Sequence, residues 1–127
     1  MAMGDATVLV VDDEPSLRLL CRVNLELEGF RVLEAGTVPA ARALLESEVV
    51  HVLVLDVHIA GEDGRDLLDE LRAADSPVRV TMLTGSADLR SSRFDGADRV
   101  LAKPFEPVDL IASVRELAEG ARVDSST

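Results

Sequence analysis

The sequence has 127 residues, of which 47% are hydrophobic and 29% are charged, a composition typical of one globular domain rather than of a disordered chain. The single cysteine, Cys21, excludes an internal disulfide framework and a cysteine-rich zinc site. Twenty-four acidic residues against 13 basic ones give a net charge of −11, and only three residues are aromatic, so we expect no direct binding to nucleic acid and no attraction to an anionic membrane.

Short apolar runs of strand length alternate along the chain with longer segments of helical period. Strands are predicted at Thr7–Val11, Arg31–Glu34, His51–Leu55, Val78–Leu83 and Arg99–Ala102. The first helix is expected to open at Pro15 and to end at Gly29, and Gly36-Thr37 is expected to cap the second. A third helix carries Leu67, Leu68 and Leu71, a weak fourth ends before Phe94, and the last begins at Pro107.

Five strand-then-helix units predict an α/β fold, a doubly wound parallel sheet of five strands. The strands are almost entirely apolar, which is typical of a sheet that is covered on both faces. We expect the domain to occupy residues 7–120, after an N-terminal extension of residues 1–6 and before a flexible tail or linker remnant at 121–127. No apolar run reaches the roughly 20 residues of a membrane span, and no signal segment is visible, so we expect a cytoplasmic protein.

Reactive side chains follow four of the predicted strands, at the edge of a parallel sheet where ligands bind. Asp12 and Asp13 follow the first strand, Asp56 the third, Thr84 the fourth and Lys103 the fifth. Three carboxylates in one place favour a hard cation such as Mg²⁺ or Mn²⁺. An ammonium and a hydroxyl beside them suit the oxygens of a phosphoryl group.

Each of these residues also has an ordinary structural interpretation. Asp12 or Asp13 could cap the first helix, Asp56 could cap a loop, Thr84 could stabilise a turn and Lys103 could be a solvated side chain. Four separate strands that place such groups at one edge are improbable by chance. The combination therefore predicts a functional site.

These residues stand in motifs whose order resembles the receiver domain of two-component response regulators. The motifs are Val10-Val-Asp-Asp-Glu14, Leu55-Asp56, Asp63-Gly64, Leu83-Thr84 and Ala102-Lys-Pro-Phe105, and the resemblance runs from about Val8 to about Leu117. It implies a flavodoxin-like fold with strand order 2-1-3-4-5, and phosphorylation by a histidine kinase or a histidine phosphotransfer protein. It also implies a signalling module, coupled to a downstream target or a fused output domain, rather than an enzyme.

The resemblance also implies a role for each matching residue. Asp56 corresponds to the phosphoacceptor, Lys103 to the lysine that pairs with the phosphoryl oxygens, and Thr84 to the hydroxyl that moves toward them. Asp12 and Asp13 correspond to the acidic pair that binds Mg²⁺, together with Asp56 and the backbone carbonyl of His58.

Some positions depart from the family pattern. Val100 stands where the family usually has an aromatic ring that takes part in the switch. Only 18 residues separate Thr84 from Lys103, about three fewer than is usual, which predicts a short fourth helix. Ala60 replaces the usual proline, and the side chain of His58 would border the phosphoryl group, either tuning its hydrolysis or having no role.

Two other functions compete with that of a phosphoacceptor module. A phosphatase of the haloacid dehalogenase type also uses a strand-end aspartate with Mg²⁺, but His58 stands where such an enzyme carries its acid/base carboxylate. A degenerate receiver that only binds other proteins is the alternative. Val100 and the short fourth segment favour it, whereas the intact set of Asp12, Asp13, Asp56, Thr84 and Lys103 opposes it.

Overall fold

The computed structural model describes residues 6–85 and 94–126, with the side chains of the second range described as far as residue 120. Its main sheet has five parallel strands in the order β2-β1-β3-β6-β7. The strands are β1 (Thr7–Val11), β2 (Arg31–Ala35), β3 (Val52–Asp56), β6 (Arg79–Thr84) and β7 (Arg99–Ala102). Because β6 and β7 are the fourth and fifth strands predicted, this order confirms the expected doubly wound fold.

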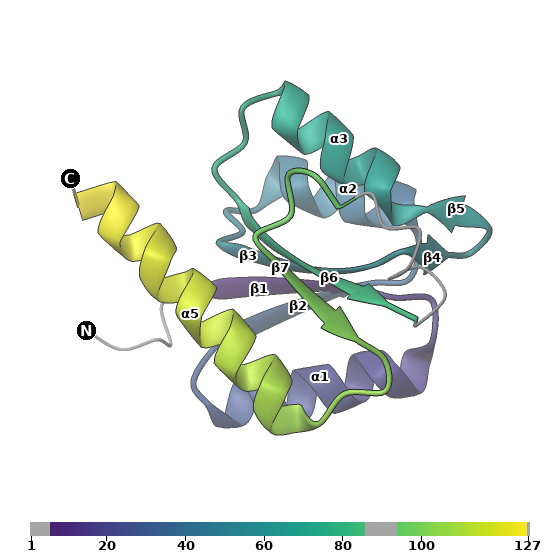
Figure 1. The fold of residues 1–127 in the computed structure, drawn as a ribbon, viewed down its shortest axis with the longest axis horizontal. Helices are drawn as coiled ribbons and strands as arrows, with labels where there is room; N and C mark the ends of the chain where they lie inside the picture. Colours follow the sequence, from purple (N-terminus) through teal and green to yellow (C-terminus); the bar gives the residue numbers. More distant parts are fainter. Residues whose placement is uncertain (1–5, 86–93, 127) are drawn as a thin grey trace.

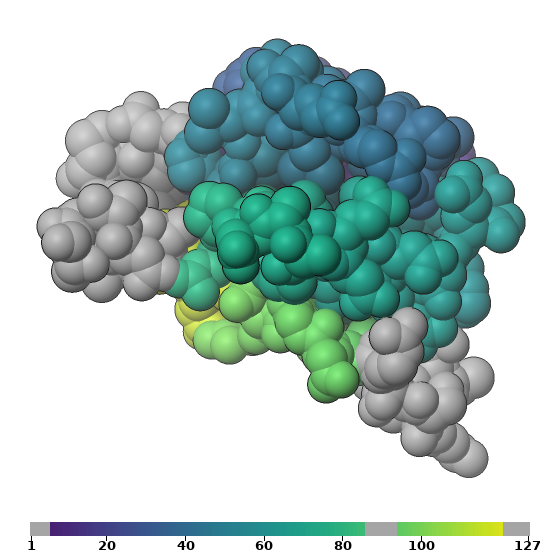
Figure 2. All heavy atoms as spheres, turned by 90° about the horizontal axis from the view of Figure 1, so that it is seen from above, coloured from purple at the N-terminus to yellow at the C-terminus, as the bar shows by residue number. Residues whose placement is uncertain are grey.

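Helices cover both faces of the sheet (Figure 1). α1 (Pro15–Leu27) and α5 (Pro107–Ser126) lie on one face, and α2 (Val38–Ser47) and α3 (Gly64–Ala73) lie on the other. Figure 2 shows α2 in blue beside α3 in teal over that second face. The fourth helix expected from the sequence falls on residues 86–93, outside the described part of the chain.

The three central strands, β1, β3 and β6, are buried because their residues alternate between two apolar cores, whereas the edge strands β2 and β7 are partly exposed. Val8, Val10 and Leu83 pack with α1 and α5 in one core. Leu9 and Leu53 pack with α2 and α3 in the other, where they are fully buried. Burial of each such side chain contributes about 1.5–3 kcal/mol to stability, so the patterned apolar runs fix the sheet between its helices.

The helix boundaries follow local signals in the sequence. Pro15 opens α1, which ends before Gly29, a residue with φ of 96° that glycine adopts without strain. The Thr37 side chain accepts a hydrogen bond from the Ala40 amide and caps α2, as predicted. α5 continues to Ser126, past the predicted end of the domain at 120; the domain boundary and the flexible tail or linker remnant at 121–127 stay predictions.

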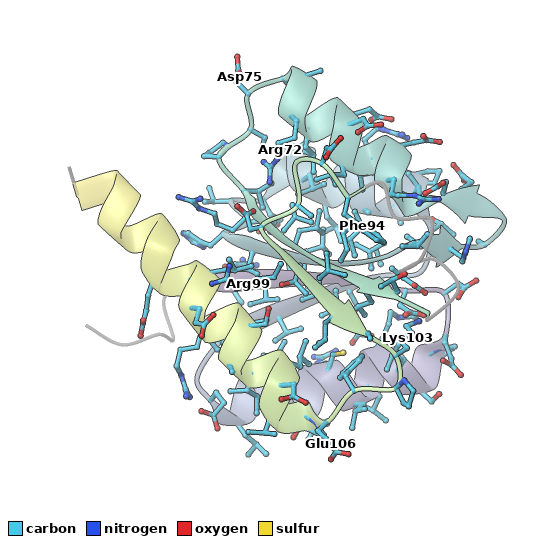
Figure 3. The ribbon with its side chains drawn as sticks, in the orientation of Figure 1. Arg72, Asp75, Phe94, Arg99, Lys103 and Glu106 are labelled. Carbon is cyan, nitrogen blue, oxygen red and sulfur yellow. The ribbon has the colours of Figure 1, made fainter. Side chains whose placement is uncertain are left out.

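The chain that leads into β7 is tied to α3 by Arg72 (Figure 3). Its Nε donates to the Gly96 carbonyl oxygen at 2.8 Å, and its Nη2 lies 3.2 Å from Asp98 Oδ2. The same Asp98 oxygen accepts a hydrogen bond from the Val80 amide at 2.7 Å. These contacts fix the start of β7 against β6, and thereby place Lys103, which follows β7, at the edge of the sheet.

Candidate functional site

The predicted acidic residues meet at the carboxyl ends of the strands. Carboxylate oxygens of Asp12, Asp13 and Asp56 all lie within 4.8 Å of one another. Asp12 and Asp56 are buried, with 1% and 7% of their surfaces exposed, whereas Asp13 is exposed. Three like charges at this separation repel each other strongly in a partly buried site. The cluster therefore requires a compensating positive charge.

Lys103 supplies one such charge. Its Nζ donates to Asp56 Oδ2 at 2.9 Å and to Asp12 Oδ2 at 3.1 Å, and its side chain is 29% exposed. Burial opposes the charged form of this amine, but the hydrogen bonds to Asp56 and Asp12 outweigh that effect and raise the Lys103 pKa. The ammonium ion therefore bridges two of the three carboxylates.

The environment of Asp56 alters its acidity. Burial raises the pKa of the Asp56 carboxyl above its ordinary value, Lys103 opposes this, and the negative charge of Asp12 adds to it. Loss of the lysine would raise this pKa further, while a bound cation would lower it. The ionised carboxylate that a phosphoacceptor needs thus depends on nearby positive charge.

Glycine at position 64 allows α3 to begin directly against the end of β3. A Cβ atom on Gly64 would overlap the backbone carbonyl oxygen of Asp56. The Gly64 amide also donates to the Val57 carbonyl oxygen at 2.6 Å. Asp63 caps α3 through a 2.9 Å hydrogen bond from the Arg65 amide to its Oδ1, so the Asp63-Gly64 motif predicted to lead into the third helix holds the backbone beside Asp56.

Thr84 is the last residue of β6 and is fully buried. Its Oγ1 donates to the Gly85 carbonyl oxygen at 3.2 Å. Its own backbone carbonyl accepts a 2.8 Å hydrogen bond from the Lys103 amide, so the two residues are held at the same edge. The Thr84 hydroxyl thus donates to a backbone carbonyl, whereas Asp56 accepts its hydrogen bond from Lys103.

The loop after Asp56 forms a small hairpin that the sequence analysis missed. β4 (His58–Ile59) pairs antiparallel with β5 (Glu62–Asp63), with Ala60 and Gly61 between them at φ of 50° and 83°. Positive φ at both loop residues is typical of the type I′ turn that closes a two-residue hairpin. A proline, whose ring fixes φ near −65°, could not occupy the position of Ala60 in this turn.

The hairpin also reaches back to the acidic pair. The Ala60 amide donates to Asp13 Oδ2 at 2.8 Å, a hydrogen bond that proline could not donate. His58, the first residue of β4, has an exposed side chain and pairs with Asp63. His58 follows Asp56 by two positions in the chain. The role of the His58 backbone carbonyl as a metal ligand stays a prediction.

The interpretation of Asp12 or Asp13 as a cap of the first helix is not supported. The residue at the N-cap of α1 is Glu14, whose side chain makes no capping hydrogen bond. Asp12 Oδ1 accepts the Glu14 amide at 2.9 Å, while its other oxygen faces Lys103. A carboxylate group shared between the turn and the lysine fits a binding site better than a cap.

The donor set suits a hard divalent cation. Mg²⁺ prefers oxygen ligands and retains several waters, so it is commonly bound by only a few carboxylates. Asp12, Asp13 and Asp56 offer such oxygens within 4.8 Å of one another, and the exposure of Asp13 leaves that side open to solvent. The residues present therefore fit the ion that the sequence predicted.

Comparison with known proteins agrees with this geometry. Residues 8–115 match the response regulator receiver domain family. The chain belongs to that family. This confirms the resemblance drawn from the strand-end motifs and accounts for the fold and for the acidic pocket, at which receiver domains generally bind Mg²⁺.

Two similar sequences are bacterial transcriptional regulators. The transcriptional regulatory protein YvrH of Bacillus subtilis is 34% identical over 116 residues, which is 89% of this chain and 49% of that protein. AruR of Pseudomonas aeruginosa is 35% identical over 127 residues, which is 91% of this chain and 50% of that protein. The chain thus spans about half the length of these relatives.

Solved receiver domains have the same fold. A CheY-like receiver domain protein from Methanospirillum hungatei superposes with a TM-score of 0.86 at 28% identity, over 94% of this chain and 98% of that one. The receiver domain of a LuxO repressor protein from Vibrio parahaemolyticus gives a TM-score of 0.84 at 25% identity, over 94% of this chain and 95% of that one.

Among the described residues, no helix is both long and apolar enough to cross a membrane.

Proposed function

We propose that this receiver domain accepts a phosphoryl group on Asp56 in a Mg²⁺-dependent reaction, with a phosphorylated histidine of a kinase or phosphotransfer protein as donor. The observation that carries the proposal is the convergence of three carboxylates within 4.8 Å, with the Lys103 ammonium 2.9 Å from Asp56 and 3.1 Å from Asp12. Phosphoryl transfer depends mainly on positioning and on neutralising the charge of the transferred group. The grouping of the carboxylates with Lys103 at this edge of the sheet supports both requirements.

Each residue has a defined part in this proposal. An oxygen of Asp56 attacks the phosphorus, the P–N bond to the donor imidazole breaks, and the imidazole nitrogen takes up a proton from solvent as it leaves. Lys103 keeps its charge and pairs with a phosphoryl oxygen, while the Thr84 hydroxyl donates a hydrogen bond to another. Asp12, Asp13, Asp56 and the His58 carbonyl would hold Mg²⁺, or Mn²⁺, whose positive charge would offset repulsion between the carboxylate and the incoming anion.

An apolar surface on α1 is suited to the phosphodonor. Four large side chains there are between 39% and 78% exposed, namely Leu19, Leu20, Val23 and Leu27. Of these four, Leu20 also lines a groove of about 350 Å³, together with Glu14, Leu17, Lys103, Pro104 and Phe105. Because the groove includes Lys103, a partner seated on α1 lies next to the proposed phosphorylation site. An exposed apolar surface of this kind is typical of a docking site for a protein.

Val100 leads us to propose an atypical switch. It lies on β7 opposite Met82 and is 40% exposed. Valine is branched at Cβ and has few rotamers, so it cannot make the large swing of an aromatic ring. The signal would then leave the domain without a ring rotation, either to a fused output domain or to a separate protein. We place this activity in the cytoplasm.

Intact-protein mass spectrometry tests the proposal directly. The chain is incubated with Mg²⁺ and acetyl phosphate, beside Asp56→Asn, a metal-free sample, and Asp109→Asn as a control in the first turn of α5. We expect one phosphoryl adduct on the wild type and on Asp109→Asn, and none on Asp56→Asn or without metal. Absence of both adduct and Mg²⁺ binding in the wild type would instead favour a degenerate receiver that acts as a protein-binding scaffold.

A further inference from the structure

The side chain of Arg18 turns back from α1 toward the acidic pair. Its Nη1 donates to the backbone carbonyl oxygen of Asp12 at 2.8 Å, and its Nε donates to Glu34 Oε1 on β2 at 3.1 Å. Only 21% of this long side chain is exposed. Arg18 thus connects α1 and β2 to the residue that begins the turn carrying Asp12 and Asp13.

Gly36 leaves the space that the guanidinium group occupies. A Cβ atom at position 36 would lie 2.9 Å from Arg18 Nη1. Gly36 is not among the glycines with positive φ, so its backbone does not itself require glycine. A side chain at position 36 would therefore compete with the Arg18 guanidinium for this space, so the glycine is compatible with the Arg18 contact and a larger residue would displace it.

The geometry of Asp12 depends on contacts from several directions. Its amide donates to the Ala35 carbonyl oxygen at 3.1 Å, and its carboxylate accepts from the Glu14 amide and from Lys103. Arg18 adds a hydrogen bond to its carbonyl oxygen. A residue that is held at its amide, carbonyl and carboxylate has little freedom to rotate, which pre-organises its oxygen atoms for a cation.

The effect of Arg18 is positional more than electrostatic. Glu34 neutralises its guanidinium charge at 3.1 Å, so little net charge reaches the acidic cluster from this ion pair. Glu34 is also bound by Arg22, whose Nη1 lies 2.9 Å from Oε2. When Arg18 is removed, Glu34 stays paired with Arg22. An Arg18 substitution therefore removes the contact with Asp12 without leaving Glu34 unpaired.

We infer that Arg18 is a positioning residue of the metal site: it holds the turn after β1 so that Asp12 and Asp13 present their oxygens to a divalent cation. The inference rests on the metal-binding part of the proposed function. Residues that orient metal ligands commonly change metal affinity by about 10- to 100-fold when they are altered. Because Arg18 touches a backbone carbonyl rather than a ligand oxygen, we expect a loss of about tenfold, the lower end of that range.

Calorimetric titration of the full chain with Mg²⁺ tests this inference, since the dissociation constant separates a positional role from a purely structural one. Arg18→Met is compared with Arg22→Met, which removes the other partner of Glu34 without touching Asp12. We expect about tenfold weaker binding for Arg18→Met and a change of less than about twofold for Arg22→Met. At saturating Mg²⁺, the phosphoryl adduct of Arg18→Met should return to the wild-type level.

Gly36→Ala supplies a second variant that keeps every charged group in place. Its new methyl group should displace the guanidinium and weaken Mg²⁺ binding in the same direction as Arg18→Met. Wild-type affinity in Arg18→Met, or an equal loss in Arg22→Met, would overturn the inference while leaving the proposed function intact. A wild-type chain that binds no Mg²⁺ would instead show that the proposed function fails.

Discussion

Replacing Lys103 with methionine should change Mg²⁺ binding and phosphoryl transfer in opposite directions. In the structure its ammonium bridges Asp12 and Asp56, so a cation that binds these carboxylates must compete with it. A hydrogen bond to a charged group contributes about 1.5–3 kcal/mol, and the partial exposure of Lys103 favours the lower value. Because 1.4 kcal/mol corresponds to a factor of ten, we expect Lys103→Met to bind Mg²⁺ about tenfold more tightly.

The same substitution should slow the chemistry and weaken the metal-free fold. Without Lys103, a phosphoryl oxygen on Asp56 loses its cationic partner, and Asp12 keeps a buried charge with no ammonium beside it. Removing one partner of a buried pair costs about 3 kcal/mol, part of which Mg²⁺ should restore. Calorimetry measures the affinity, mass spectrometry the rate of adduct formation, and urea unfolding the stability.

Arg99→Met is the matched control, because Arg99 begins β7 and pairs with exposed Glu116 away from the acidic cluster. Its Mg²⁺ affinity should equal that of the wild type. Lys103 is also the only lysine in the chain, so selective labelling of lysine gives one side-chain NMR signal that should shift when Mg²⁺ is added. Unchanged or weaker Mg²⁺ binding in Lys103→Met would refute the competition that the geometry implies.

Three further predictions concern stability and reactivity. Gly64→Ala should destabilise the fold by about 2 kcal/mol, measured by urea unfolding, because its Cβ would overlap the Asp56 carbonyl oxygen; wild-type stability would contradict this contact. The hydrogen bond from Arg65 lowers the pKa of Asp63, so the stabilisation from this pair should be complete above the unfolded pKa near 3.9 and should be lost as the pH falls through the lower folded pKa. Asp63→Asn keeps a capping side chain, and its stability in unfolding curves should not fall in this acidic range. An equal loss of stability in the variant would count against the pair. Burial raises the pKa of the Cys21 thiol to about 12, so Ellman's reagent should label the native chain only as fast as it opens, and rapid labelling at pH 8 would show that the thiol is accessible.

The sequence predicted the sheet, its strand order through the family resemblance, and the reactive residues that gather at the carboxyl edge of the sheet. Two periodicities made this possible, since apolar strands and amphipathic helices can be distinguished locally. The carboxyl ends of parallel strands meet at one edge, so Asp12, Asp56 and Lys103 could be placed together although 43 residues lie between the first two and 46 between the last two. The Asp63-Gly64 motif likewise marked the start of α3.

Only the tertiary structure decided how these groups are paired. Three contacts depend on rotamers and on distances between segments far apart in the chain. Lys103 bridges two carboxylates, Ala60 donates to Asp13, and Arg18 holds the Asp12 carbonyl. The β4–β5 hairpin was missed because its strands have two residues each, too short for any periodicity. Local patterns thus determined which groups reach the edge of the sheet, and packing between elements determined which of them interact.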